Sequence, residues 1–162
     1  MHLTEKQIKG RLDDFQQAAR EAGIKVTHQR LSIYRLLTTS ENHPSAEEIY
    51  AKLKKKMPTV SLDTVYRTLW MLADLGFINT VSQDRGSIRF DGKTDHHHHF
   101  YCIRCRILRD FTNKELSKLK IPKEAKEYGE TISLQVEVQG ICDKCHKKEN
   151  KSPINKQKRS KT

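Results

Sequence analysis

The sequence has no long apolar run: its longest, LWMLA at 69–73, has five residues. A helix that crosses a membrane needs about 20 such residues, so we expect no membrane contact. The first residues, MHLTEKQIKGRLDD, are polar and lack the apolar core of a secretory signal peptide. We therefore expect a cytoplasmic protein.

Acidic residues are scarce beside basic ones, with 20 Asp and Glu against 31 Lys and Arg and a net charge of +11. The excess is uneven, because residues 147–162 carry 7 basic and 1 acidic side chain, which is +6. This end has almost no apolar content, so residues 149–162 are predicted to form a basic disordered tail. The tail is either a solvated flexible end or a segment attracted to DNA phosphates without sequence preference.

Residues 1–90 show the pattern of a winged-helix DNA-binding domain. Apolar residues at helical spacing predict helices over 4–22, from 27 to about 39, from 45, and over 61–76. Ser45 and Glu48 form a capping box at the start of the third. Two strand-like runs, FINTVS and SIRF, follow and are joined by the turn QDRG.

The fourth predicted helix is the candidate DNA reader. Val65, Leu69 and Leu72 cluster on one side with Leu62, which leaves a polar outward face. An ordinary amphipathic helix with a solvated face has the same pattern, but the place of this helix before a wing favours insertion into the major groove. Its candidate DNA contacts are Ser61, Thr64, Tyr66 and Arg67.

Residues 96–148 predict a small α/β domain after a hinge over 91–95, so the expected fold class is α+β. HHFYC and ILRDF are strand-like, and the charged stretches NKELSKLK and KEAKEYG are helical. In TISLQVEVQGIC strict alternation predicts a half-buried strand with Ile132, Leu134, Val136 and Val138 on one face. Because the domain is small, we expect dimerisation or a structural metal to complete its core.

Cysteine is scarce, and in the cytosol four cysteines hold metal more often than they form disulfides. The four form two Cys-x-x-Cys pairs separated by 36 residues: Cys102 with Cys105, and Cys142 with Cys145. Two such pairs build a closed tetrahedral Zn²⁺ site with no open position, so a structural role is predicted. His146 could replace one thiolate, and reduced thiols without metal or a redox pair are the alternatives.

Four consecutive histidines, His96 to His99, precede the first cysteine pair. In an extended strand His97 and His99 point to one face and His96 and His98 to the other. One pair can chelate an ion from a single face, and the spacing alone leaves open which pair does so.

Five segments together resemble the ferric uptake regulator (Fur) family. They are His43 in NHPSAEEIY, then SLDTVYRTL, RFD, HHHHFYCIRC and ICDKC, in the family's order over about residues 10–148. The resemblance implies a homodimeric winged-helix repressor of double-stranded operator DNA. It also implies a regulatory metal between the DNA-binding and dimerisation domains.

The family register implies that His97 and His99 are regulatory-metal ligands, together with His43, Asp91 and Asp110. Three imidazoles and two carboxylates suit Fe²⁺ or Mn²⁺. Singly, His43 before Pro44 could be a helix-entry residue, Asp91 a turn former and Asp110 a surface strand residue. Five matches in one register favour a metal site, with His96 and His98 as bystanders or secondary-site candidates.

Aspartate at 91 and 110, where iron-uptake regulators usually carry Glu, resembles the family's peroxide-stress branch (PerR). That resemblance implies hydrogen peroxide sensing by iron-catalysed oxidation of His43 or His97, whereas Mn²⁺ supports DNA binding without this reactivity. It also suggests Lys25 and Arg30 as phosphate or minor-groove contacts and Tyr66 as a base contact. Arg67 instead resembles the iron-uptake branch, which leaves operator preference open.

Three rival functions differ in testable ways. An iron-uptake repressor would use Fe²⁺ only as corepressor, and an interaction module with only structural zinc would show no metal-dependent DNA affinity. A zinc hydrolase needs an open metal position and a general base. The sequence lacks an HExxH motif. We therefore expect no enzyme and no small-molecule substrate, with peroxide acting only as a signal.

Overall fold

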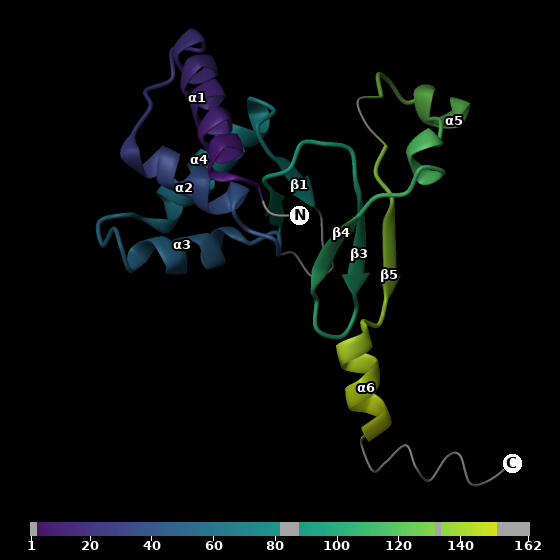
Figure 1. The fold of residues 1–162 in the computed structure, drawn as a ribbon. Helices are drawn as coiled ribbons and strands as arrows, with labels where there is room; N and C mark the ends of the chain where they lie inside the picture. The colour runs from purple at the N-terminus through teal and green to yellow at the C-terminus, as the bar shows by residue number, and fades with distance from the viewer. Residues whose placement is uncertain (1–2, 82–87, 132–133, 152–162) are drawn as a thin grey trace, which may run out of the picture. The chain divides into compact units, whose positions relative to one another are not determined.

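The computed structural model describes residues 3–81, 88–131 and 134–151, and for residues 149–151 it describes the backbone alone. The chain divides into two compact units, Met1–Asp95 and His96–Thr162 (Figure 1). The predicted turn QDRG lies outside the described residues, as does most of the predicted basic tail.

The four predicted helices of the first unit are confirmed, and side-chain caps set their starts. They are α1 (Glu5–Glu21), α2 (His28–Thr38), α3 (Ala46–Lys54) and α4 (Leu62–Asp74). Thr4 and Gln7 form a capping box on α1, as Ser45 and Glu48 do on α3. Thr27 caps α2 and Ser61 caps α4. Gly76, with φ +74°, follows the end of α4, where a left-handed residue favours glycine.

The core of this unit lies where the four helices meet. Phe15, Tyr34 and Phe77 pack edge to face around its centre, with ring centroids 5.5 to 5.8 Å apart. From α4, Val65, Leu69 and Leu72 are fully buried, which confirms the predicted inner face of this helix. The burial of this face fixes the orientation of α4 about its own axis, and with it the direction of the opposite, outer face.

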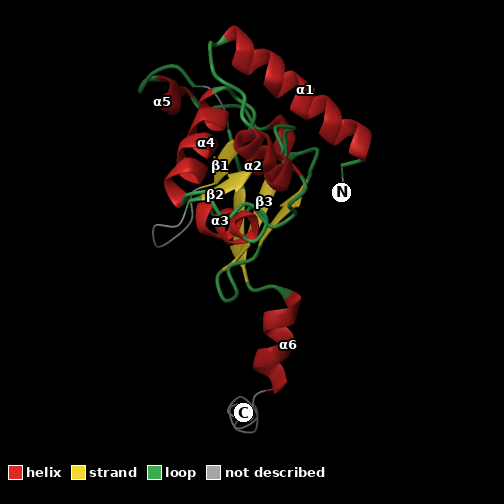
Figure 2. Cartoon of the chain, turned by 90° about the vertical axis from the view of Figure 1, so that its left-hand side faces the viewer, coloured by secondary structure: helices red, strands yellow, loops and turns green. Residues whose placement is uncertain are grey.

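Two short strands complete the first unit: β1 (Asn79–Val81) and β2 (Arg89–Asp91) pair antiparallel, with Asn79 opposite Asp91. Ser45 forms an isolated bridge with Arg89, and the Phe90 amide donates to the Pro44 carbonyl at 3.1 Å. The segment before α3 is thus pinned to β2. Helices and strands of the chain are coloured separately in Figure 2.

The last residue of β2, Asp91, and the four residues that follow it are held against the rest of the first unit. The Gly92 backbone lies so close to the end of α2 that a Cβ there would meet the Leu37 carbonyl oxygen at 3.0 Å. Arg11 of α1 donates to the Gly92 carbonyl and pairs with the Asp95 carboxylate at 3.5 Å. Asn79 donates to the Lys93 carbonyl at 3.2 Å. We name residues 91–95 the connector.

The second unit is built on a three-stranded sheet in the order β4-β3-β5. Its strands are β3 (His98–Cys102), β4 (Leu108–Phe111) and β5 (Glu137–Gly140). β3 and β4 are antiparallel with His99 opposite Asp110, and β3 and β5 are parallel with Cys102 opposite Gly140. A 3₁₀ turn, η1 (Leu116–Lys118), and a short helix, α5 (Lys123–Lys126), stand where the longer charged helical stretches were predicted.

Two predictions for the second unit were wrong in extent. Of the strand predicted over TISLQVEVQGIC, Ile132 and Ser133 lie outside the described residues, and within the described part the strand runs over Glu137–Gly140. Val138, on its supposed inner face, is 41% exposed. Among the described residues, β5 lies at one edge of the sheet beside β3, and most of its side chains are exposed. Helix α6 (Asp143–Lys151) includes 149–151, which were assigned to a disordered tail. Asp143 in its first turn favours this helix through the helix dipole.

The predicted α+β class is confirmed, with helices and a wing in the first unit and a mixed sheet in the second. Among the described residues, no helix combines the length and the apolar character that crossing a membrane requires.

Candidate metal centres and DNA-reading helix

The four cysteines of the second unit converge. Cys102 ends β3, Cys105 lies in the turn after it, and Cys142 and Cys145 lie at the start of α6. Their sulfur atoms are all within 4.8 Å of one another, and Cys105 Sγ lies 3.6 Å from Cys142 Sγ. The parallel register of β3 and β5 produces this convergence, because it brings the two Cys-x-x-Cys pairs to one end of the sheet.

The protonation of these thiols favours a cation between them. Burial raises the pKa of Cys102, but backbone amides of Cys142, Cys105 and Arg104 outweigh it and lower that pKa to about 6. The Cys105 side chain, with smaller effects from burial and the other thiols, raises the pKa of Cys145 to about 12. Four sulfurs so close together cannot all be thiolates without a compensating charge. Four sulfur donors fit structural Zn²⁺, with no position left open.

The first unit holds one imidazole and one carboxylate side by side. His43 Nε2 lies 3.5 Å from Asp91 Oδ1, and both side chains are buried. Asp91 Oδ1 also accepts from the Lys93 amide at 2.8 Å, which fixes the carboxylate. A buried imidazole and a buried carboxylate are suited to share a divalent cation, since the cation offsets the cost of burying the charge.

His43 is held in an uncommon backbone conformation. Its φ is +45°, although it is not glycine and precedes a proline. Its carbonyl accepts from Arg89 Nη1 at 3.2 Å, and the same guanidinium lies 3.5 Å from Glu48 of α3. Such strain persists where the surroundings impose it, and it is found most often at functional sites. Arg89 is therefore a supporting residue that the sequence alone did not identify.

The second unit holds a matching group of donors. His97 Nε2 and His99 Nε2 lie 3.1 Å apart. Asp110 Oδ1 is 3.8 Å from the first and 3.7 Å from the second. The antiparallel register supplies the carboxylate, because Asp110 stands opposite His99. Three donors that point to one position can chelate an ion from this unit alone.

The other two histidines lie on the opposite face, as strand alternation predicts. The His96 and His98 rings are 5.1 Å apart, and the His98 ring also packs at 5.5 Å from Phe111. His98 is buried, and its Nε2 lies 3.5 Å from the Ser117 hydroxyl.

On α4, the predicted DNA contacts differ in how they are engaged. The Ser61 hydroxyl caps the helix and lies 2.8 Å from the Thr64 hydroxyl. Arg67 is 82% exposed at its side chain, with Asp63 at 3.8 Å. Its guanidinium is therefore available to a nucleic acid at the cost of one weak surface ion pair.

Tyr66 is positioned by a residue that sequence reasoning missed. Its hydroxyl donates to Glu47 Oε1 of α3 at 2.5 Å. That bond raises the pKa of Tyr66 and lowers the pKa of Glu47. The only sequence signal for Glu47 was its place in the first turn of α3, where acidic residues are common.

Lys25 and Arg30 lie at the entry to α2. The Arg30 guanidinium donates to the Lys25 carbonyl, and Lys25 itself is exposed. The Arg30 side chain is thus held against the backbone that precedes this helix.

These features define a class before any comparison. A winged-helix unit with a polar reading helix, joined to a small domain with a four-cysteine centre and a histidine–aspartate group, is the architecture of a metal-dependent DNA-binding regulator. The model of the Ferric uptake regulator family matches residues 21–139, so the chain belongs to that family. The protein is therefore a metal-dependent transcription repressor of this family and not an enzyme.

Known proteins agree with this placement. The chain is 30% identical over 148 residues to the peroxide-responsive repressor PerR of Staphylococcus aureus, covering 91% of this chain and all of that one. The Vibrio cholerae ferric uptake regulator is 30% identical with a TM-score of 0.61, covering 78% of this chain and 98% of the other. The Helicobacter pylori regulator, at 24% identity, supports the fold, with a TM-score of 0.73 over 90% of this chain and 97% of that one.

Proposed function

We propose that the protein is a homodimeric repressor whose operator binding requires one divalent cation, and that it senses hydrogen peroxide through that cation. The carrying observation is that each unit presents its own group of buried or half-buried donors. These groups are His43 with Asp91, and His97 with His99 and Asp110. The proposal joins them into one site for Fe²⁺ or Mn²⁺.

The chain's own residues would turn metal binding into DNA affinity. A cation held by both groups would restrict the movement of the first unit relative to the second. It favours operator binding only if it binds the DNA-competent arrangement more tightly than the others. In a dimer, two copies of α4 would then be held at a spacing that matches successive major-groove faces, about 34 Å apart.

The DNA contacts proposed are the outer face of α4 and the entry to α2. Arg67 can donate to a guanine edge or a phosphate, and Tyr66 and Thr64 can contact a thymine methyl. Ser61, Lys25 and Arg30 would contact phosphates or the minor groove. Support comes from the exposure of Arg67 and from the rotation of α4 that its buried face fixes.

Dimerisation is assigned to the second unit. Four exposed hydrophobic side chains of this unit are assigned to the dimer interface, which would remove them from water. They are Ile103, Leu119, Val138 and Ile141. Regulators of this family bind operator DNA as dimers, which supports the same assignment.

In the proposed sensing step, the group that is oxidised is one of the histidine ligands of the regulatory cation. When bound, Fe²⁺ supplies the electron that cleaves the O–O bond of hydrogen peroxide, whereas Mn²⁺ does not react in this way. His43 and His97 are the proposed targets, since their imidazoles would lie next to the cation. The net reaction of one hydrogen peroxide molecule would place one oxygen atom in a ring C–H bond and leave one water. The oxidised imidazole would be a weaker donor, so metal binding and repression would be lost. Relatedness to a peroxide-responsive repressor supports this step.

The test is operator binding by the purified protein titrated separately with Mn²⁺ and Fe²⁺, with and without peroxide. We expect both metals to support binding and peroxide to abolish it only in the Fe²⁺-loaded protein. A peptide containing His43 or His97 should then gain the mass of one oxygen atom. Oxidation confined to cysteine peptides would contradict the sensing step.

An iron-uptake repressor is the second candidate, because Arg67 occupies the reading helix and the identity to the Vibrio cholerae regulator is also 30%. Here Fe²⁺ acts only as corepressor. Peroxide-treated Fe²⁺ protein would then regain full operator binding when fresh Fe²⁺ is added, whereas an oxidised ligand histidine would prevent recovery.

A further inference from the structure

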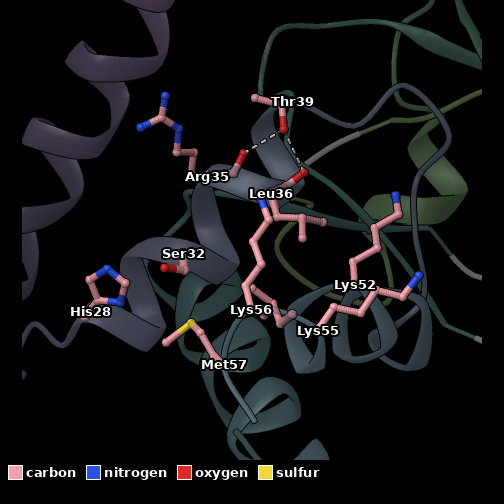
Figure 3. Close-up of a pocket in the computed structure, with 10 residues that line it drawn as sticks. His28, Ser32, Arg35, Leu36, Thr39, Lys52, Lys55, Lys56 and Met57 are labelled. Carbon is pink, nitrogen blue, oxygen red and sulfur yellow. Dashed lines mark hydrogen bonds between the residues drawn. The ribbon is translucent and has the colours of Figure 1, made fainter.

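The first unit carries a groove that the metal and DNA functions do not use. It lies between α2 and the end of α3 and has a volume of about 570 Å³, within the range of ligand sites in proteins. Figure 3 shows its lining. The residues are His28, Ser32, Arg35, Leu36 and Thr39 on the α2 side, and Lys52, Leu53, Lys55, Lys56 and Met57 on the α3 side.

The groove has an apolar floor and a cationic rim. Leu36, Leu53 and Met57 supply the apolar lining, with Leu53 buried and the other two half-buried, and Lys52, Lys55 and Lys56 supply the cations. None of these lining residues is acidic. Arg35 already pairs with Glu5 of α1 at 2.9 Å, so the three exposed lysines carry most of the unbalanced charge. An amphipathic anion complements this combination better than a purely polar one does.

The groove faces away from the proposed DNA contacts. Along α2 and its C-cap, the lining residues His28, Ser32, Arg35 and Thr39 follow one another at spacings of four, three and four residues. Their side chains therefore lie along one face of the helix, which forms a stripe. Arg30, two positions after His28, points about 160° away from that stripe's start. On α3, Glu47 meets Tyr66 of α4, whereas Lys52 lies about 140° further around the helix. Helix α3 thus separates the groove from the reading helix.

The length of the groove favours a chain over a small molecule. Its α2 edge runs from His28 to Thr39, or about 16 Å along the helix axis. Two roughly facing helices with an apolar floor between them form the seat that an amphipathic helix occupies in helix-in-groove recognition. A DNA backbone would use the lysines but leave the floor unpaired.

We propose that this groove docks an acidic amphipathic helix of a partner protein. Apolar side chains at positions i, i+3 and i+4 of that helix would cover the half-buried Leu36 and Met57, whereas Leu53 is already buried. Carboxylates flanking them would pair with Lys52, Lys55 and Lys56. The inference is independent of the metal site, because every residue it uses lies on α2, on α3, at α3's C-cap or in the two residues after that cap.

The experiment uses the full chain and a fluorescein-labelled synthetic helix with leucines at i, i+3, i+4 and i+7 and glutamates on both flanks. A peptide of the same composition with the pattern scrambled is the first control. Binding is followed by fluorescence anisotropy. The variants are Lys52→Glu/Lys55→Glu/Lys56→Glu and a control with the same change of charge in the second unit, Lys118→Glu/Lys120→Glu/Lys123→Glu.

We expect saturable binding of the patterned peptide, a loss of about tenfold or more in the groove variant, and less than about twofold change in the control variant. Equal losses in both variants would reduce the effect to net charge and overturn the proposal. Equal binding of the scrambled peptide would overturn it as well. Full competition by double-stranded DNA would assign the surface to nucleic acid instead.

Discussion

At the scale of single residues, the metal chemistry depends on donor type and on what holds each donor. The four cysteines suit zinc because four sulfur donors complete its tetrahedral coordination. Imidazoles and carboxylates instead suit Fe²⁺ or Mn²⁺. His146 was the one sequence alternative to a cysteine ligand. Among the described residues, the group of donors within 4.8 Å of one another consists of the four cysteines and does not include His146. This favours the all-cysteine centre.

Replacing Cys142 by Ser should release zinc and destabilise the second unit, since a structural zinc contributes directly to folding free energy. Zinc content by mass spectrometry and thermal unfolding by circular dichroism measure the two effects. His146→Ala is the matched control and should keep both zinc and the melting temperature. If His146→Ala lost zinc while Cys142→Ser retained it, the ligand set would be wrong.

Arg67 tests the DNA-reading face. Arg67→Ala should weaken operator binding by about 1–3 kcal/mol, because an exposed guanidinium at this place can bond a base edge or a phosphate. A mobility-shift titration in excess Mn²⁺ measures the loss. Lys120→Ala, an exposed cation of the second unit, is the control. An unchanged Arg67→Ala affinity would remove α4's outer face from the interface.

At the scale of elements, the caps and periodicities of the first half were sufficient to predict all four helices of the first unit. Ser45 and Glu48 form the capping box that was predicted at the start of α3. Prediction failed where pairing across the chain decides the structure. The pairing of Glu137–Gly140 with β3, for example, joins segments far apart in the sequence. Likewise, Arg89 and Glu47 act through partners 19 to 46 residues away.

The connector shows the same limit, since its sequence, DGKTD, indicated only a hinge. The structure fixes it to the first unit through Arg11, Asn79 and the close approach of Gly92 to α2. Asp91 is thereby held in place at the start of the connector. A donor that is already positioned loses less entropy when it binds a cation.

Arg11→Ala should therefore weaken Mn²⁺ binding by about tenfold, through the loss of a charged hydrogen bond to the connector. Isothermal titration with Mn²⁺ measures this change. Arg35→Ala, which removes an exposed ion pair with Glu5, is the control and should bind Mn²⁺ like the unchanged protein. Equal affinity in the Arg11 and Arg35 variants would mean that the connector is positioned without Arg11.

At the scale of the whole molecule, the proposed function depends on two units that would each supply part of the proposed regulatory donor set. The sequence predicted the members of that set through the family register, because five motifs in series are far more specific than any one of them. It could not predict how each half is built. The left-handed backbone of His43 and the cross-strand partnership of His99 with Asp110 arise only from folding.

The most direct measurement is a crystal structure of the full-length protein loaded with Mn²⁺, with the ion located by its anomalous scattering. The account predicts one manganese peak bound by His43 and Asp91 of the first unit together with His97, His99 and Asp110 of the second. A peak bound by the donors of only one unit, or no peak at these residues, would contradict it.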